Sequence, residues 1–233
     1  MGALWTDCGA LICSATDQPY TAEGMIDWMA PEAIEALKFY RKMVDEELTP
    51  PHGFDDWFPT FQRGKLASVQ AQSSRGVWGQ KLHGEANMAT SPIPTLEKGG
   101  GAGTVYWGNG LAVVNQAPYP QEVTDFYIYA LGPANANMQK AVIRSGKTPI
   151  YNSAYDEIIE NDPMFSTFKW MNGMRDDVAN SIPVPRNTFY LIQHQAYQKR
   201  IVEFTEDSSM TPETCAQLIL EDSQTEIDKQ KVQ

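Results

Sequence analysis

Two tryptophans are placed where an aromatic ring can bind a ligand. Trp78 and Trp107 lie in the glycine-containing segments RGVWG and YWGNG, each beside an expected strand. Because glycine has no side chain, the neighbouring backbone leaves a ring face open to solvent. Such a face stacks on the C–H groups of a sugar, while nearby polar side chains bind its hydroxyl groups. We therefore predict that these rings bind a neutral polar ligand; a packing role is the alternative interpretation.

The titratable residues form no catalytic arrangement in the sequence. The three histidines are scattered and match no metalloprotease or hydrolase motif. Two pairs of adjacent carboxylates, Asp55 with Asp56 and Asp176 with Asp177, would point apart on a helix. This favours solvated charges at helix ends over an acid–base pair. The glycine run at 99–103 lacks the Gly-Lys-Ser/Thr of a phosphate loop. We expect no enzymatic activity, no cofactor and no metal.

Length and charge limit the class of protein further. With 233 residues, the chain is long enough for one large domain or two small ones. Its net charge of −11 argues against nucleic acid and anionic membrane surfaces, because proteins that bind them concentrate Lys and Arg on one face. The charge favours a soluble partner or a neutral ligand. No apolar run approaches the ~18 residues that a membrane-spanning helix needs.

The three cysteines do not form a recognisable site. Cys8, Cys13 and Cys215 have no metal-ligand spacing, and an odd number cannot form a closed disulfide framework. We predict free, buried thiols. A disulfide between Cys8 and Cys13 is the alternative.

The elements that must position the two rings are mostly helices. Periodic apolar residues and proline and glycine at helix ends predict helices at 30–48, 55–63, 121–131, 137–145, 154–160, 163–177, 188–206 and 212–229. Segment 5–15 is predicted to form one or two helical turns that end in a loop. Asp162 and Thr211 are predicted to cap the helices that follow them. Alternating side chains predict strands at 65–72, 86–94 and 110–115, with a loop at 73–78 that carries Trp78. The proline-containing segments 148–151 and 182–185 should be extended.

Several motifs occur in an order that resembles a known family, the extracellular solute-binding proteins of ABC importers, which capture sugars and oligosaccharides. The motifs are PEAIEAL at 31–37, FQRGKLA at 61–67, PIP at 92–94 followed by glycines, GNGLAV at 108–113, GKTP at 146–149, MTPE at 210–213 and a final charged helix. Each motif alone is a loose pattern. Together they cover nearly the whole chain in the order that the family shows.

The resemblance implies an α/β fold with a periplasmic-binding-protein-like two-lobe architecture, incomplete here and with a helix-rich C-terminal part. On that map, residues 1–85 and 151–233 form the C-terminal lobe, and residues 93–146 form part of the N-terminal lobe. Residues 86–92 and 147–150 would be the hinge crossings. Ligand would bind between the lobes.

The resemblance also implies a function and a site. The chain would be the substrate-binding component of an ABC transporter, with a carbohydrate or other small polar solute as ligand and a membrane permease as partner. It would be periplasmic or extracellular, and membrane-associated, as a lipoprotein, in a full-length parent. The ligand contacts of the family fall here on Ser74, Trp78, Trp107, Asn109, Arg186 and Tyr190. A carbohydrate-active enzyme and a non-catalytic interaction domain are the alternative functions.

One departure from the family is large. Family members begin with a long N-terminal half-lobe that has no counterpart in this sequence, and segment 1–18 lacks the basic and apolar regions of a signal peptide. The stretch 93–146 buries too little apolar surface to stand alone as a lobe. We therefore expect a longer parent, a companion chain that supplies the absent half, or an oligomer.

Overall fold

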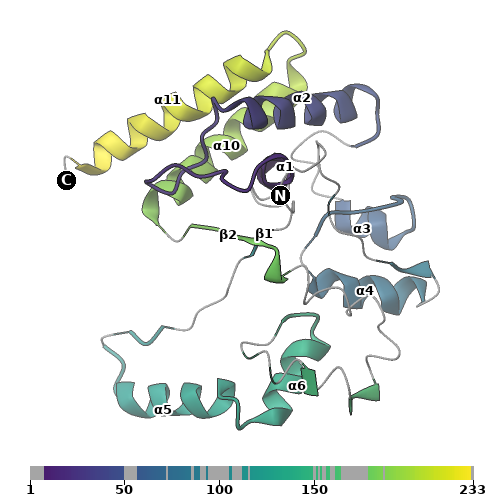
Figure 1. Cartoon of the computed structure of the whole chain (residues 1–233), viewed down its shortest axis with the longest axis vertical. Coiled ribbons are helices and arrows are strands. Elements are labelled where there is room, and N and C mark those ends of the chain that lie inside the picture. Colours follow the sequence, from purple (N-terminus) through teal and green to yellow (C-terminus); the bar gives the residue numbers. More distant parts are fainter. Residues whose placement is uncertain are drawn as a thin grey trace. The chain divides into compact units, whose positions relative to one another are not determined.

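The chain folds into two compact units that each combine segments distant in sequence (Figure 1). The computed structural model describes residues 8–49, 57–71, 73–84, 87–89, 93, 105–106, 112–114, 116–148, 151, 153, 156–157, 161–163, 178–185 and 187–231. Unit 1 consists of Met1–Thr60, Pro92–Tyr106 and Asn180–Gln233, and unit 2 of Phe61–Ser91 and Trp107–Ala179. The predicted lobes and hinges have different boundaries and stay a prediction.

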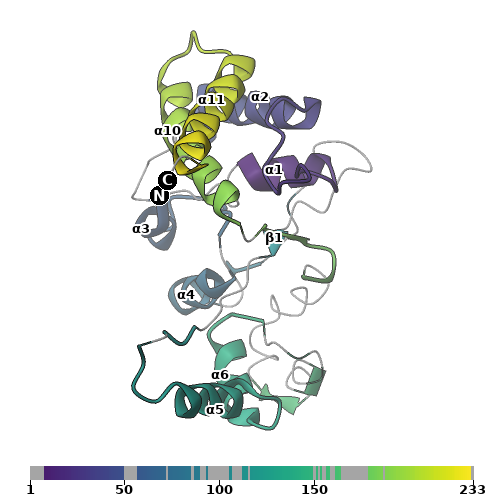
Figure 2. The same cartoon turned by 90° about the vertical axis from the view of Figure 1, so that its left-hand side faces the viewer.

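Among the described residues, four helices and a short parallel sheet lie wholly within unit 1. The helices are α1 (Cys8–Ala15), α2 (Pro31–Asp45), α10 (Thr188–Glu206) and α11 (Pro212–Lys231). The sheet pairs β1 (Val105–Tyr106) with β2 (Ile182–Pro183), with Val105 opposite Ile182. Helices α10 and α11 lie side by side in both views, and α2 packs against α1 and α11 (Figures 1 and 2).

Aromatic side chains fill the core of unit 1. Trp28, which precedes α2, is fully buried and stacks on Tyr197 of α10, with ring centroids 5.4 Å apart and planes at 14°. Leu37, Phe204 and Ile219 are fully buried in the same cluster. Burying large apolar side chains supplies the main favourable free energy of folding, so this cluster holds α2, α10 and α11 together.

A buried glutamine ties the segment before α2 to α10. The Gln193 carbonyl accepts a hydrogen bond of 2.7 Å from the Ile26 amide, and its side-chain amide donates one of 2.9 Å to the Ile26 carbonyl. Gln193 therefore satisfies both backbone groups of a residue 167 positions away, as a neighbouring strand would. Without it, both groups would be buried unpaired.

Helix ends in unit 1 follow the sequence signals. Proline occupies the start of α2 and of α11, where its missing N–H costs nothing. The Thr211 hydroxyl accepts a hydrogen bond of 3.1 Å from the Thr214 amide, which confirms its predicted capping role. Asn187 caps α10 by accepting one of 2.7 Å from the Tyr190 amide.

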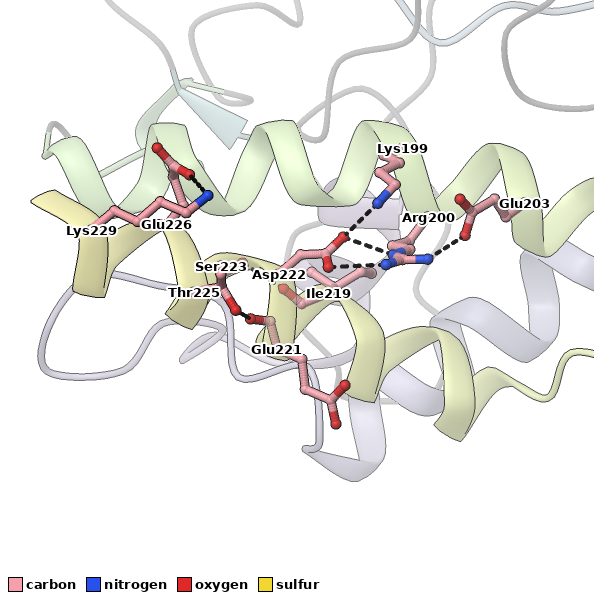
Figure 3. Close-up of polar contacts among 10 residues, drawn as sticks. All are labelled: Lys199, Arg200, Glu203, Ile219, Glu221, Asp222, Ser223, Thr225, Glu226 and Lys229. Atoms are coloured by element: carbon pink, nitrogen blue, oxygen red, sulfur yellow. Dashed lines mark hydrogen bonds and ion pairs between the residues drawn. The ribbon is translucent and has the colours of Figure 1, made fainter.

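An ion-pair cluster joins α10 to α11 (Figure 3). The Nε and Nη2 atoms of Arg200 donate hydrogen bonds of 2.8 and 2.9 Å to the Asp222 carboxylate. The Nη1 atom donates one of 2.6 Å to Glu203. Lys199 adds a longer contact of 3.3 Å to Asp222. The hydrogen bonds from Arg200 are the main cause of the lowered pKa of Asp222.

Unit 2 contains α4 (Ser74–His83), α5 (Pro120–Leu131) and α6 (Ala136–Arg144), and α3 (Trp57–Gln62) lies at the boundary between the units. Gln139 of α6 is buried, and its side-chain amide donates a hydrogen bond of 2.9 Å to the Leu131 carbonyl at the end of α5. The Arg144 guanidinium donates one of 2.8 Å to the Asp162 carboxylate. Asp162, predicted as a helix cap, is buried in this contact.

The structure confirms most helical predictions and corrects the strands. Helices are found at seven predicted places: α1, α2, α3, α5, α6, α10 and α11. The predicted strand at 65–72 is wrong for its described residues 65–71, and the described residues of 86–94 and 110–115 are not strands either. Short alternation does not specify a strand unless a neighbour completes its hydrogen bonds. Most of the predicted helices 154–160 and 163–177 lies outside the described residues.

Candidate functional site

Trp78, predicted in a loop, lies on a helix. The segment 73–78 begins α4, which runs from Ser74 to His83, so the loop prediction is wrong. The Trp78 side chain is nevertheless 55% exposed, and Leu82, one turn further along, is 54% exposed. Residues four apart share one face of a helix, so these two side chains form an exposed apolar surface.

The opposite side of α4 is fixed by close packing. Val77 and Gln80 are buried, and so is Gly79. A Cβ atom at Gly79 would lie 2.8 Å from Met88 Cε and 3.2 Å from the Phe61 ring. The missing side chain at Gly79 leaves room for these neighbours to approach the helix closely. The packed side therefore holds α4 in place while Trp78 stays exposed.

Both ends of α4 are also held. At its start, a Cβ atom at Gly146 would lie 2.7 Å from the Ser74 Cα, and Gly146 has φ +80°. At its end, a ring nitrogen of His83 lies 3.1 Å from the Phe61 carbonyl, and the two rings meet edge to face at 5.5 Å. Ser74, a predicted ligand contact, is half-buried beside Gly146 on the helix that carries Trp78.

A cation lies over the Trp78 ring. The Lys81 ammonium is 5.8 Å from the ring centroid, and Arg75 is exposed one turn before Trp78. A cation at this distance from an indole face is attracted by the π electrons. Sequence reasoning missed Lys81 and Leu82, because their place beside the ring depends on a helix that was not predicted.

Tyr190, another predicted ligand contact, faces the core of unit 1. It is 2% exposed and meets Tyr20 edge to face at 6.1 Å. Burial raises the pKa of the Tyr190 phenol above its usual range. The packing therefore does not support direct contact with a ligand at this position. The other predicted contacts, Trp107, Asn109 and Arg186, lie outside the described residues.

The cysteines are free and buried, as predicted, and the alternative disulfide between Cys8 and Cys13 is not formed. Burial is the main cause that raises the pKa of Cys13 and of Cys215 to about 12, so neither thiol ionises readily at neutral pH. Within the described ranges, no cluster of His, Cys, Asp or Glu side chains is placed to bind a metal ion. None of the described helices is both long and apolar enough to cross a membrane.

A shallow hollow of about 410 Å³ lies at the end of α10. Glu203, Glu206, Asp207 and Met210 line it. It has three carboxylates and no aromatic ring in its lining, so it lacks the stacking face that a sugar site uses. The exposed face of α4 remains the better candidate.

One comparison with known proteins shows the family, and another shows the fold. Residues 10–167 match the family model of bacterial extracellular solute-binding proteins. Among solved structures, the chain is similar to a cyclo/maltodextrin-binding protein complexed with maltotetraose, with a TM-score of 0.66 and 17% sequence identity. A comparison with curated proteins found no match.

The structural similarity covers 97% of this chain but only 57% of that protein, so the chain spans little more than half of its length. This confirms the predicted solute-binding-protein fold in an incomplete form. The family model covers more than half of the chain, from the first turn of α1 past α6. The chain belongs to the family of bacterial extracellular solute-binding proteins.

Proposed function

We propose that this chain is the part of a solute-binding protein that binds a carbohydrate, or another small polar solute, for an ABC importer. Membership of the solute-binding family supports binding and an extracellular or periplasmic location. The similar structure contains maltotetraose, which supports a sugar as the ligand. We also propose a membrane permease as the partner and attachment to the membrane in a full-length parent. These two points rest on the resemblance to the family alone.

The observation that carries the sugar proposal is the exposed indole of Trp78. Burying a large aromatic side chain is favourable, yet this ring is 55% exposed while the other side of α4 is packed. Stacking on sugar C–H groups would cover the ring without displacing any core contact. Ser74 lies on the same helix, and Trp107, Asn109 and Arg186 complete the proposed set of contacts, from which the buried Tyr190 is removed.

The experiment is a titration of the purified chain with maltotetraose and a panel of neutral mono- and oligosaccharides. Calorimetry and saturation-transfer NMR are the readouts, because they do not depend on the indole that is mutated. Trp78→Ala should lower the affinity about ten- to a hundredfold, which corresponds to about 1–3 kcal/mol. Phe39→Ala removes another exposed aromatic side chain, on α2, and should change affinity little.

Two outcomes would contradict the proposal. If no sugar binds the chain, or if Trp78→Ala binds as the wild type does, the ring has another role. A non-catalytic interaction domain then becomes the better interpretation. Turnover of a glycoside that disappears with one Asp or Glu substitution would instead support the carbohydrate-active enzyme.

We also propose that a further polypeptide segment covers exposed apolar side chains around α5. Tyr119, just before the helix, and Phe126, Ile128 and Tyr129 within it are 60–73% exposed, which is unusual for large apolar groups. The occupant is the part of the solute-binding fold that this chain does not span, supplied by a longer parent or a companion chain. Without it, the chain should self-associate through these side chains. Light scattering tests this, and a monodisperse monomer of 26 kDa that binds sugar tightly would contradict it.

A further inference from the structure

The excess of negative charge is confined to one part of the sequence. Unit 2 contains nine acidic and nine basic residues, so the whole net charge of −11 belongs to unit 1. Within unit 2, the segment 61–91 that contains α4 is mainly basic: it has Arg63, Lys65, Arg75 and Lys81 and one acidic residue, Glu85. The unit that carries the candidate site thus has no excess of negative charge and should repel an anion less than unit 1 does.

Lys81 differs from several other lysines of this acidic protein. Lys38, Lys199 and Lys229 each contact a carboxylate, at 2.8, 3.3 and 3.1 Å. Lys81 makes no ion pair among the described residues, and its ammonium lies over the Trp78 ring. The ammonium therefore stands over an exposed indole, and no carboxylate among the described residues is paired with it.

Trp78 and Lys81 together have the features of a site for an anion that also has an apolar face. Arg75, Trp78 and Leu82 are spaced three and four residues apart, so they line one exposed face of α4, and Lys81 borders it. The indole covers C–H groups, and the ammonium pairs with a negative group at the edge of the same ring. A neutral sugar would stack on the indole and leave the ammonium without a partner.

We propose that the exposed face of α4 binds an acidic carbohydrate, an oligosaccharide of uronic acids, in which Trp78 stacks on a sugar ring and Lys81 pairs with its carboxylate. The inference rests on the proposed sugar-binding function and narrows its ligand class. It differs from the expectation from net charge, which favoured a neutral ligand, because the charge of the whole chain does not describe the surroundings of α4.

The test compares tetragalacturonate with maltotetraose on the full chain, by calorimetry at low ionic strength. Tetragalacturonate should bind about fivefold or more tightly than maltotetraose, and added salt should reduce this difference. Lys81→Met should lower the affinity for tetragalacturonate about fivefold and the affinity for maltotetraose less than twofold. Lys81→Arg should retain the preference, because it keeps the charge.

Lys42→Met is the matched control. Lys42 is an exposed lysine on α2, and its loss changes the net charge of the chain by the same amount as the loss of Lys81. Both lysines are exposed, so neither substitution should disturb folding, which circular dichroism checks. If Lys42→Met weakens tetragalacturonate binding as much as Lys81→Met does, the effect belongs to net charge and the inference is wrong.

The remaining outcomes separate this inference from the function on which it rests. Equal binding of the two oligosaccharides, or equal losses for both in Lys81→Met, overturns the acidic ligand and leaves a sugar-binding protein. Failure of both oligosaccharides to bind overturns the proposed function and the acidic ligand with it.

Discussion

The ion pair between α10 and α11 allows a quantitative test of how the C-terminal helices are held together. Asp222→Asn keeps the shape of the side chain and removes its charge, so the contacts with the Arg200 guanidinium at 2.8 and 2.9 Å lose their ionic character (Figure 3). The Arg200 side chain is 17% exposed and the Asp222 side chain 30%. The pair is therefore partly shielded from water.

The loss of stability expected for Asp222→Asn lies between the losses for exposed and for buried ion pairs. Exposed pairs contribute about 0.2–1 kcal/mol, while breaking a buried pair costs about 3–5 kcal/mol. Two parallel charge-assisted hydrogen bonds place this pair above the exposed class. Glu203 keeps a contact with Arg200, which limits the loss. We expect Asp222→Asn to lower the free energy of unfolding by about 1–2 kcal/mol near pH 7.

The effect should depend on pH in a defined direction. The hydrogen bonds from Arg200 lower the pKa of Asp222 in the folded state below the value of about 3.9 for an unfolded chain. The stabilisation is therefore fully present above that value, and it is lost as the pH falls through the folded pKa. At lower pH the wild-type carboxyl is neutral too, and the difference between wild type and Asp222→Asn should disappear.

Urea unfolding followed by circular dichroism measures the difference at several pH values. Glu221→Gln is the control, because it removes one negative charge from the neighbouring, exposed position of the same helix. The reasoning fails if the two variants lose equal stability near pH 7. It also fails if the loss in Asp222→Asn is independent of pH.

Two further comparisons use matched residues, again by urea unfolding. Gln193→Leu should lower the free energy of unfolding by about 2–4 kcal/mol, because it leaves two buried backbone groups unpaired. Gln195→Leu, at an exposed position of α10, should lower it little. Equal losses of stability in the two variants would contradict this account. Gly146→Ala should destabilise unit 2 by about 2–4 kcal/mol, because it combines a strained φ with a clash against Ser74. Gly84 has a similar φ of +81°, but a Cβ atom there would meet open space, so Gly84→Ala should cost about 1 kcal/mol. A similar loss of stability in both variants would show that the clash at Gly146 is relieved.

The sequence predicted the long C-terminal helices well because their signals are local. The predicted range 188–206 coincides with α10, and the predicted start at Pro212 is the start of α11. Proline at the first helical position and a threonine cap before it act within one turn of the helix. Such signals need no knowledge of the rest of the fold.

The helix α4 could not be predicted, because its stability comes from contacts with other segments. Gly76 and Gly79 lower the helix propensity of RGVWG, and its apolar residues show no helical period. The close approach of Met88 and Phe61 to Gly79 stabilises the helix instead. In the sequence, a glycine required for close packing looks the same as a glycine that ends a helix or forms a loop.

This error changes how the candidate site is understood. In a loop, the neighbours of the Trp78 ring would be glycines, and recognition would depend on the indole face alone. On a helix, the ring lies beside the side chains three and four residues away, which are Arg75, Lys81 and Leu82. The chemistry of the site is then set by cations as well as by the aromatic face. The exposure of the ring was predicted from its glycines, but the charge beside it follows only from the helix, and this charge is what distinguishes an acidic from a neutral ligand.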